Sequence, residues 1–235
     1  MKHDDGARGA QNTQNAQNAQ DFKGTLPQLN VETLTLGPLE TNCYIVSCNG
    51  EAFVIDPAAN GVALAQKLKA DGVQVALIIA THGHGDHVGG VKALKDALPY
   101  DAAFALSAPD IELALHAAEP KNHSFGYDDN APYPQLLLED ETTLKLGPYT
   151  FEVIQTPGHT PGSVVLYSAD AGIAFTGDTV FRHSIGRTDF QESVPQLMPS
   201  SLQKLQQKVQ NETILYPGHG QMTRMDEELK HNPYF

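Results

Sequence analysis

The chain has 235 residues, 40% of them hydrophobic, which is enough to bury one sizeable core. Its 28 acidic residues outnumber its 15 Lys and Arg and give a formal net charge of −13, so we expect no nucleic-acid partner. No apolar run is long enough to span a membrane and no signal-peptide core is visible, so we expect no membrane partner and a cytoplasmic location.

The first 24 residues form a polar, repetitive segment that contains the Gln/Asn/Ala-rich stretch 11–20. A segment of this composition buries too little apolar surface to offset the entropy lost on ordering, and we predict a disordered, low-complexity tail. Residues 25–235 show no internal boundary and are predicted to form one domain.

Short apolar segments separated by Gly and Pro turns continue through the rest of the chain. Strands are predicted over 31–36, 42–47, 52–55, 75–80, 102–106, 143–146, 150–155, 163–168, 173–176 and 213–216. Helices are predicted over 61–70, 88–98, 108–118, 196–210 and 224–230. A polar connection covers 119–135. This order predicts two sheets packed face to face with helices outside.

The two cysteines, Cys43 and Cys48, lie in or at the end of one predicted strand. At this spacing they point to opposite faces of the strand and are too far apart for an easy disulfide. We predict two reduced, packed thiols, as expected in a cytoplasmic protein.

Four potential metal ligands directly follow the predicted strand 75–80: His82, His84, Asp86 and His87. Two glycines in this segment let the loop fold back so that the side chains converge. Imidazole and carboxylate together suit zinc, iron or manganese and leave room for a bound water. The segment therefore predicts an open hydrolytic or oxidative metal site and not a closed structural one.

Three later loops repeat the pattern of an apolar strand followed by a Gly or Pro turn that carries a His or an Asp. They contain His159, Asp178 and His219. Strand ends at one edge of stacked sheets bring such loops together. Four ligand-bearing loops at strand ends therefore predict a single metal centre.

Over about residues 30–235, these motifs resemble all five sequence motifs of the metallo-β-lactamase superfamily of metallohydrolases. The resemblance implies an α/β fold, a four-layer αββα sandwich with the metal site at one edge of the two sheets. It also implies that Asp56, in the first motif Val54–Pro57, supports the metal loop through bonds to the backbone.

The resemblance implies two divalent metal ions, with zinc preferred and iron or manganese as alternatives. It assigns His82, His84 and His159 to the first metal; Asp86, His87 and His219 to the second; and Asp178 to the bridging position. A hydroxide between the ions, with its pKa lowered to roughly 7, is expected to attack a carbonyl held at the first metal. Asp86 is the catalytic candidate, because it is expected to steer the water or accept its proton.

Three further segments, 177–190, 217–220 and 232–235, resemble the glyoxalase II group, in its short bacterial type without the added C-terminal helical domain. This implies a thioesterase whose partner is a small-molecule thioester such as S-lactoylglutathione. Arg187 matches a basic, substrate-contacting position. Because the missing domain supplies the residues that hold glutathione, a thioester is favoured more strongly than glutathione as its carrier.

Five alternatives remain open. Residues 186–191 also resemble persulfide dioxygenases, which bind one iron through two His and one Asp, here His82 or His84 with His159 and Asp178. Nuclease relatives usually carry basic surfaces that are not visible here, and lactonases and true β-lactamases differ in segment 185–190. A non-catalytic binding module normally loses ligands, and this chain keeps all of them.

His183 is a candidate to face the cleft, and the sequence does not specify the oligomeric state.

Overall fold

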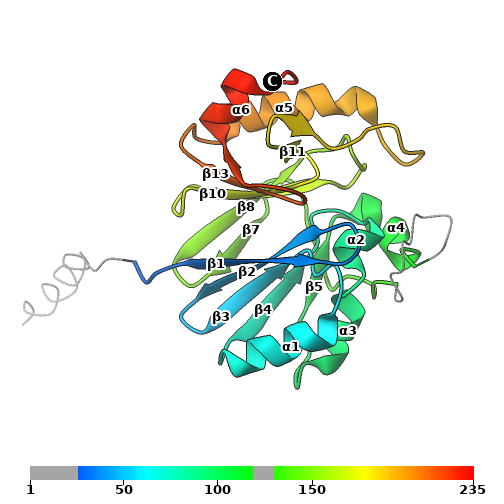
Figure 1. Cartoon of the computed structure of the whole chain (residues 1–235), viewed down its shortest axis with the longest axis vertical. Helices are drawn as coiled ribbons and strands as arrows, with labels where there is room; N and C mark the ends of the chain where they lie inside the picture. The colour runs from blue at the N-terminus through cyan, green and yellow to red at the C-terminus, as the bar shows by residue number, and fades with distance from the viewer. Residues whose placement is uncertain (1–25, 119–129) are drawn as a thin grey trace, which may run out of the picture.

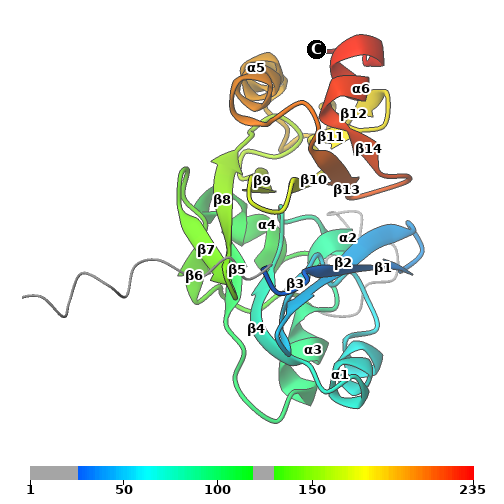
Figure 2. The same ribbon diagram turned by 90° about the vertical axis from the view of Figure 1, so that its left-hand side faces the viewer.

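A computed structural model describes residues 26–118 and 130–235, which form two six-stranded sheets with helices on both outer sides (Figure 1). The predicted tail and the first part of the predicted connection, residues 119–129, lie outside the described residues. Figure 2 shows the same four layers edge-on, with α1 and α3 on one outside and α5 and α6 on the other. The predicted αββα sandwich is confirmed.

The first sheet has the order β1-β2-β3-β4-β5-β6. Its strands are β1 (Asn30–Leu36), β2 (Thr41–Cys48), β3 (Glu51–Ile55), β4 (Gln74–Ile79), β5 (Phe104–Leu106) and β6 (Leu136–Leu137). β1 to β3 pair antiparallel, whereas β3 to β6 pair in parallel. The parallel part needs crossovers, and these contain α1 (Gly61–Ala70), α2 (Gly85–Val88), α3 (Val91–Ala97) and α4 (Ile111–Leu115).

The second sheet has the order β14-β13-β10-β9-β8-β7. Its strands are β7 (Thr143–Leu146), β8 (Tyr149–Gln155), β9 (Val164–Ser168), β10 (Ile173–Gly177), β13 (Ile214–Pro217) and β14 (Thr223–Arg224). β10 and β13 are parallel and are joined through α5 (Met198–Lys208), and α6 (Met225–His231) follows β14. A separate hairpin, β11 (Val180–Phe181) with β12 (Ser184–Ile185), follows β10.

Three apolar layers hold the sandwich together. Between the first sheet and its helices, Val54 and Ile78 pack with Leu64 and Leu94. Between the two sheets lies a second cluster that includes Phe53, Ile55, Ile79, Phe151 and Phe175. A third joins the second sheet to α5 and includes Ile154, Val165, Leu202 and Leu205. Because both faces of the central strands are covered, these strands are apolar runs without polar alternation.

The predicted elements differ from the structure mainly where an element is short. The helix predicted over 88–98 is shorter in the structure: Val88 is the last residue of α2, and α3 begins only at Val91, after Gly89 and Gly90. The helix predicted over 108–118 is a 3₁₀ turn (Ala108–Asp110) followed by the short α4. β6, β11, β12 and β14 span two residues each and have no periodicity to detect.

Both cysteines are free and buried, as predicted. Cys43 lies in the apolar layer between the first sheet and its helices, and Cys48 lies between the two sheets. Among the described residues, no helix is long and apolar enough to cross a membrane.

Phe175→Ala is expected to lower the free energy of unfolding by about 3–5 kcal/mol, because Phe175 is fully buried between the sheets and its loss leaves a cavity. Urea denaturation followed by circular dichroism measures the change. Tyr234→Ala is the matched control, since that aromatic ring is exposed, and we expect its effect to stay below about 0.5 kcal/mol. Equal effects of the two substitutions would contradict the assignment of this layer as the core.

Candidate metal centre

The segment 81–87, named here the metal loop, leaves the end of β4 and is held by the buried carboxylate of Asp56. One oxygen of Asp56 accepts from the backbone N–H of Thr81 at 2.7 Å, and the other accepts from its hydroxyl at 2.8 Å. The second oxygen also accepts from Nδ1 of His87 at 2.9 Å. Asp56 therefore fixes both the start of the metal loop and one of its imidazoles, in the supporting role that the sequence implies for it.

Three imidazoles converge at the first predicted metal position. Nδ1 of His84 lies 3.1 Å from Nε2 of His82 and 2.9 Å from Nε2 of His159. His82 and His84 come from the metal loop, whereas His159 comes from the loop after β8 in the second sheet. The structure thus brings together side chains from both sheets at the point where the strands end.

The outer nitrogens of two of these rings bond to groups that only accept hydrogen bonds. Nε2 of His84 donates to Oε1 of Glu192 at 2.8 Å, and Nδ1 of His159 donates to the Arg187 carbonyl at 2.7 Å. Each outer nitrogen must therefore carry the proton in the neutral ring. The inner nitrogens consequently point lone pairs toward the shared position, which is the tautomer that a metal ligand requires.

The second predicted group, Asp86, His87 and His219, also converges. Oδ2 of Asp86 lies 3.1 Å from Nε2 of His219 and 3.6 Å from Nε2 of His87. Nδ1 of His219 donates to the Leu39 carbonyl at 3.1 Å, which leaves its Nε2 facing the group. Asp86 and His87 belong to α2, beside the ends of both sheets at the right of Figure 1.

Asp178 lies between the two groups, where a bridging carboxylate is predicted. Its Oδ2 is 3.4 Å from Nε2 of His159, in the first group. Its Oδ1 is 3.3 Å from Nε2 of His87, in the second group, and its Oδ2 is 3.7 Å from Nε2 of His219. The structure therefore brings all seven predicted ligands together, and their coordination of metal stays a prediction.

Divalent metal ions fit this donor set. His87 Nε2 and Asp178 Oδ1 are fully buried yet make no hydrogen bond, which is costly for polar atoms unless another group binds them. Within the described part of the chain, the donor atoms form three overlapping triads that are compact enough for an ion: His82, His84 and His159; His82, His87 and Asp178; and Asp86, His87 and His219.

The protonation of the two groups differs. Burial lowers the pKa of both His82 and His159, so these rings are neutral at neutral pH. Burial also disfavours charge on His87 and His219, but nearby carboxylates, Asp86 among them, outweigh it and raise both pKa values. Protons therefore compete more strongly with a metal ion at the second group than at the first.

A cavity of about 630 Å³ opens above these donors. Leu39 and Phe181 line it beside the second group, and Phe190 lines it beside the first. Arg187 stacks on the Phe190 ring at 4.5 Å and is paired with Asp189 through two hydrogen bonds of 2.9 and 3.0 Å. The cavity thus combines apolar side chains with a floor of candidate metal ligands, as small-molecule sites commonly combine apolar and polar groups.

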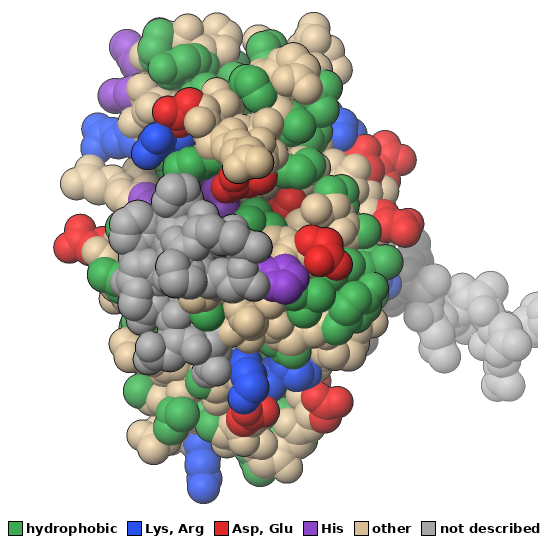
Figure 3. Space-filling view, turned by 90° about the vertical axis from the view of Figure 1, so that its right-hand side faces the viewer, with side chains coloured by type: hydrophobic (Ala, Val, Ile, Leu, Met, Phe, Trp, Pro, Cys, Tyr) green, Lys and Arg blue, Asp and Glu red, His purple; other side chains and the backbone are tan. Residues whose placement is uncertain are grey.

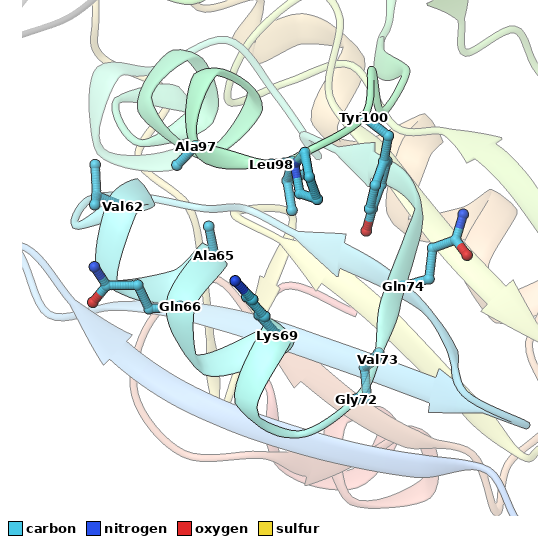
Figure 4. A pocket seen from close by; sticks show the side chains of 11 residues that line it. Val62, Ala65, Gln66, Lys69, Gly72, Val73, Gln74, Ala97, Leu98 and Tyr100 are labelled. Carbon is cyan, nitrogen blue, oxygen red and sulfur yellow. The ribbon is translucent and has the colours of Figure 1, made fainter.

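A second cavity, of about 450 Å³, lies between α1 and the segment that follows α3 (Figure 4). Val62, Ala65, Leu98 and Tyr100 supply much of its lining, and Lys69 is its charged residue. None of the residues of the three ligand triads lines this second cavity.

The prediction that His183 can face the cleft is wrong. His183 lies in the turn of the β11–β12 hairpin with a positive φ of 58°, and its ring bonds to Glu227 on α6 at 3.0 Å. The hairpin turn directs it toward the C-terminal helix, away from the cavity lining. Arg187, in contrast, does line the cavity, as its predicted role requires.

Three polar residues near the centre have no counterpart among the sequence predictions: Glu192, Asp110 and Asn42. Glu192 bonds to His84, Asp110 bonds to the metal loop, and Asn42 bonds to the loop that carries His219. Asp110 follows the predicted strand 102–106 in the same way that the ligands follow theirs, so this strand-end pattern could have found it. Nothing in the local sequence distinguishes the other two.

Comparison with known proteins agrees with this geometry. A family model described as the metallo-beta-lactamase superfamily matches residues 36–219. The hydroxyacylglutathione hydrolase GloC of Haemophilus influenzae is 28% identical over 209 residues, which cover 88% of this chain and 98% of GloC.

Solved structures with the same fold include three that bear on the chemistry. The BLEG-1 B3 metallo-beta-lactamase is 32% identical with a TM-score of 0.78, covering 87% of this chain and 99% of that one. TTHA1623, solved in a di-iron-bound form, is 33% identical with a TM-score of 0.77, and the match covers 87% of this chain and 100% of TTHA1623. ETHE1 from Myxococcus xanthus is 25% identical with a TM-score of 0.69, and the match covers 87% of this chain and 83% of ETHE1.

Acidification is expected to release metal from the second donor group first and from the first donor group only at lower pH. Because the pKa values of His87 and His219 are raised, protons begin to compete with the second ion once the pH falls through those values. His82 and His159 have lowered pKa values and stay neutral to lower pH. Elemental analysis of zinc-loaded protein dialysed between about pH 8 and pH 5 measures this. We expect a fall from two ions to one before the last is lost. Simultaneous loss would contradict the assignment.

Proposed function

This chain belongs to the metallo-beta-lactamase superfamily, and we propose that it is a two-metal hydrolase that cleaves small-molecule thioesters, in the manner of glyoxalase II. Membership in this superfamily of metallohydrolases supports an enzyme that binds divalent metal. The observation that carries the proposal is the pair of donor groups that share Asp178 on the floor of an apolar-walled cavity.

The thioester specificity is supported by where the segment 177–190 lies. This segment resembles glyoxalase II in sequence, and it lines the cavity through Asp178, Phe181, Arg187, Asp189 and Phe190. The similarity to GloC extends over almost the whole of that protein. We propose zinc as the metal of both groups, with iron as the main competitor because TTHA1623 has been solved with two irons.

When bound, the metal ions supply Lewis acidity and make a water acidic enough to act as a nucleophile near neutral pH. Residues of the chain itself position the groups that take part in the reaction. The Thr41 hydroxyl donates to Oδ2 of Asp86 at 3.1 Å, which holds that carboxylate on the cavity floor, where it is positioned to take up a proton from the attacking water.

The cavity lining also suits a leaving group that needs little protonation. Among the described lining residues, the charged side chains are Asp86, Asp178, Asp189 and Glu192, together with Arg187. Burial opposes the charge of Asp178, but His87 and the neighbouring imidazoles outweigh it and lower its pKa, so Asp178 is not a proton donor at neutral pH. A thiolate is a better leaving group than an amine or an alkoxide and needs less help from an acid.

A nucleic-acid substrate is disfavoured by the surface charge. On the face shown in Figure 3, Lys and Arg side chains are scattered among acidic and apolar ones and do not form a continuous stripe. A phosphodiester backbone binds through several aligned basic contacts. We therefore propose a small-molecule substrate.

The second candidate is a persulfide dioxygenase with one iron, held by His82 or His84 with His159 and Asp178. The resemblance of segment 186–191 to those enzymes favours it. The complete second group, Asp86, His87 and His219, is superfluous in such an enzyme and favours the hydrolase.

The purified, zinc-loaded protein is expected to hydrolyse S-lactoylglutathione, and Asp178→Ala is expected to lower kcat/KM by at least about 100-fold, because that carboxylate serves both donor groups. Absorbance of the thioester measures the rate. Asp140→Ala, a carboxylate paired with Lys204 away from the cavity, is the control and should retain activity. Absence of hydrolysis with both metals bound, or oxygen uptake with glutathione persulfide by the iron-loaded protein, would overturn the proposal.

Arg187→Ala is expected to raise KM for S-lactoylglutathione about fivefold while kcat stays within about twofold, because a rim charge contributes to binding by about 1 kcal/mol. Steady-state kinetics measure both constants. Arg224→Ala is the matched control: Arg224 pairs with Asp226 as Arg187 pairs with Asp189, but it does not line the cavity. An equal change in both variants would contradict a substrate-contacting role for Arg187.

A further inference from the structure

Two buried polar side chains, Asp110 and Asn42, bond to the loops that carry the predicted ligands, and each bonds to different loops. Asp110 bonds to the loops that carry the first donor group, and Asn42 bonds to the loop that completes the second. We propose that Asp110 and Asn42 are positioning residues that support the two metal sites separately, Asp110 the first and Asn42 the second. This inference rests on the metal centre and not on the thioester substrate.

Asp110 ties together loops from both sheets. Its Oδ2 accepts from the backbone N–H of Gly83 at 2.9 Å and from the hydroxyl of Thr160 at 2.6 Å. Its Oδ1 accepts from the backbone N–H of Gly162 at 2.7 Å. Gly83 lies between His82 and His84 in the chain, and Thr160 directly follows His159. One carboxylate thus sets the distance between the two segments that supply the first group.

The fit around Asp110 leaves little freedom. A Cβ on Gly83 would lie 2.6 Å from the Asp110 carbonyl oxygen, and a Cβ on Gly162 would lie 2.6 Å from the carboxylate carbon. Both glycines are therefore required for the close approach. Asp110 is fully buried, and its three hydrogen bonds offset part of the cost of removing a carboxylate from water.

Asn42 has the corresponding place beside the second group. Its side-chain amide donates to the carbonyls of Pro217 at 3.0 Å and Gly220 at 2.9 Å. Its backbone N–H donates to the Gly218 carbonyl at 2.8 Å. These three carbonyls surround His219 in the chain, so Asn42, from the first sheet, holds a loop of the second sheet at three points.

Neighbouring residues on β2 reinforce the second site. The hydroxyl of Tyr44 donates to the Pro217 carbonyl at 2.6 Å, and the hydroxyl of Thr41 donates to Asp86 at 3.1 Å. The Asp110 side chain bonds to Gly83, Thr160 and Gly162, which lie beside His82, His84 and His159 in the chain. The Asn42 side chain bonds to Pro217 and Gly220, on either side of His219. Because the two sets share no partner, loss of one should leave the other intact.

The test measures zinc affinity in full-length variants that retain one donor group each. His219→Ala keeps the first group, and His159→Ala keeps the second. Competition with a chromophoric chelator gives the zinc dissociation constant. In the His219→Ala background, Asp110→Asn is expected to weaken zinc binding by about 10–100-fold. The single amide oxygen can accept from Gly83 and Thr160, but the NH2 that replaces the other oxygen cannot accept from Gly162. Asn42→Ala should change zinc binding by less than about twofold.

In the His159→Ala background the expectation reverses. Asn42→Ala should weaken zinc binding by about 10–100-fold, and Asp110→Asn should leave it within about twofold. Asn232→Ala is the matched control in both backgrounds: it is buried as deeply as Asn42 and its amide bonds to Ser184 and Glu228, but it touches no ligand loop.

Milder variants keep the test decisive if a substitution prevents folding, as judged by circular dichroism. Thr160→Val removes one donor to Asp110, and Tyr44→Phe removes one donor to Pro217, each with little change of shape. The proposal is supported if Thr160→Val weakens zinc binding only in the His219→Ala background and Tyr44→Phe weakens it only in the His159→Ala background, each by a smaller factor. A variant that weakens zinc equally in both backgrounds, or in neither, overturns it.

Discussion

The buried carboxylate of Asp56 is the interaction on which the metal centre depends. It lies immediately after β3, with a positive φ of 52°, and its two oxygens accept three hydrogen bonds from Thr81 and His87. The metal loop has no regular structure of its own before α2, so this carboxylate supplies the order that a strand or helix would otherwise provide. The positions of His82 and His84 follow from it, because they continue directly from Thr81.

The sandwich architecture then determines which other residues meet the metal loop. Loops after β8, β10 and β13 in the second sheet end at the same edge as β4 of the first, and they carry His159, Asp178 and His219. The donors of each group therefore come from both sheets, and the geometry depends on how the sheets are held together at that edge. The apolar layer between the sheets sets their spacing, and Asp110 and Asn42 set the local distances.

Much of this could be predicted from sequence because it is local. A ligand such as His159 follows its own apolar strand by a few residues, and the strand-end pattern locates it without knowledge of the fold. Asn42 could not be found in this way, since its partners lie 175 and 178 residues further along the chain. His183 was misplaced for the same reason: its partner Glu227 is 44 residues away, on a helix whose position only the fold determines.

The proposed centre would hold two metal ions that share Asp178, one at each donor group. Anomalous X-ray diffraction from crystals of the purified protein, recorded at the zinc and iron absorption edges, tests it most directly. We expect two anomalous peaks, one in contact with His82, His84 and His159, and the other in contact with Asp86, His87 and His219. A single peak, or a peak elsewhere in the molecule, would contradict it.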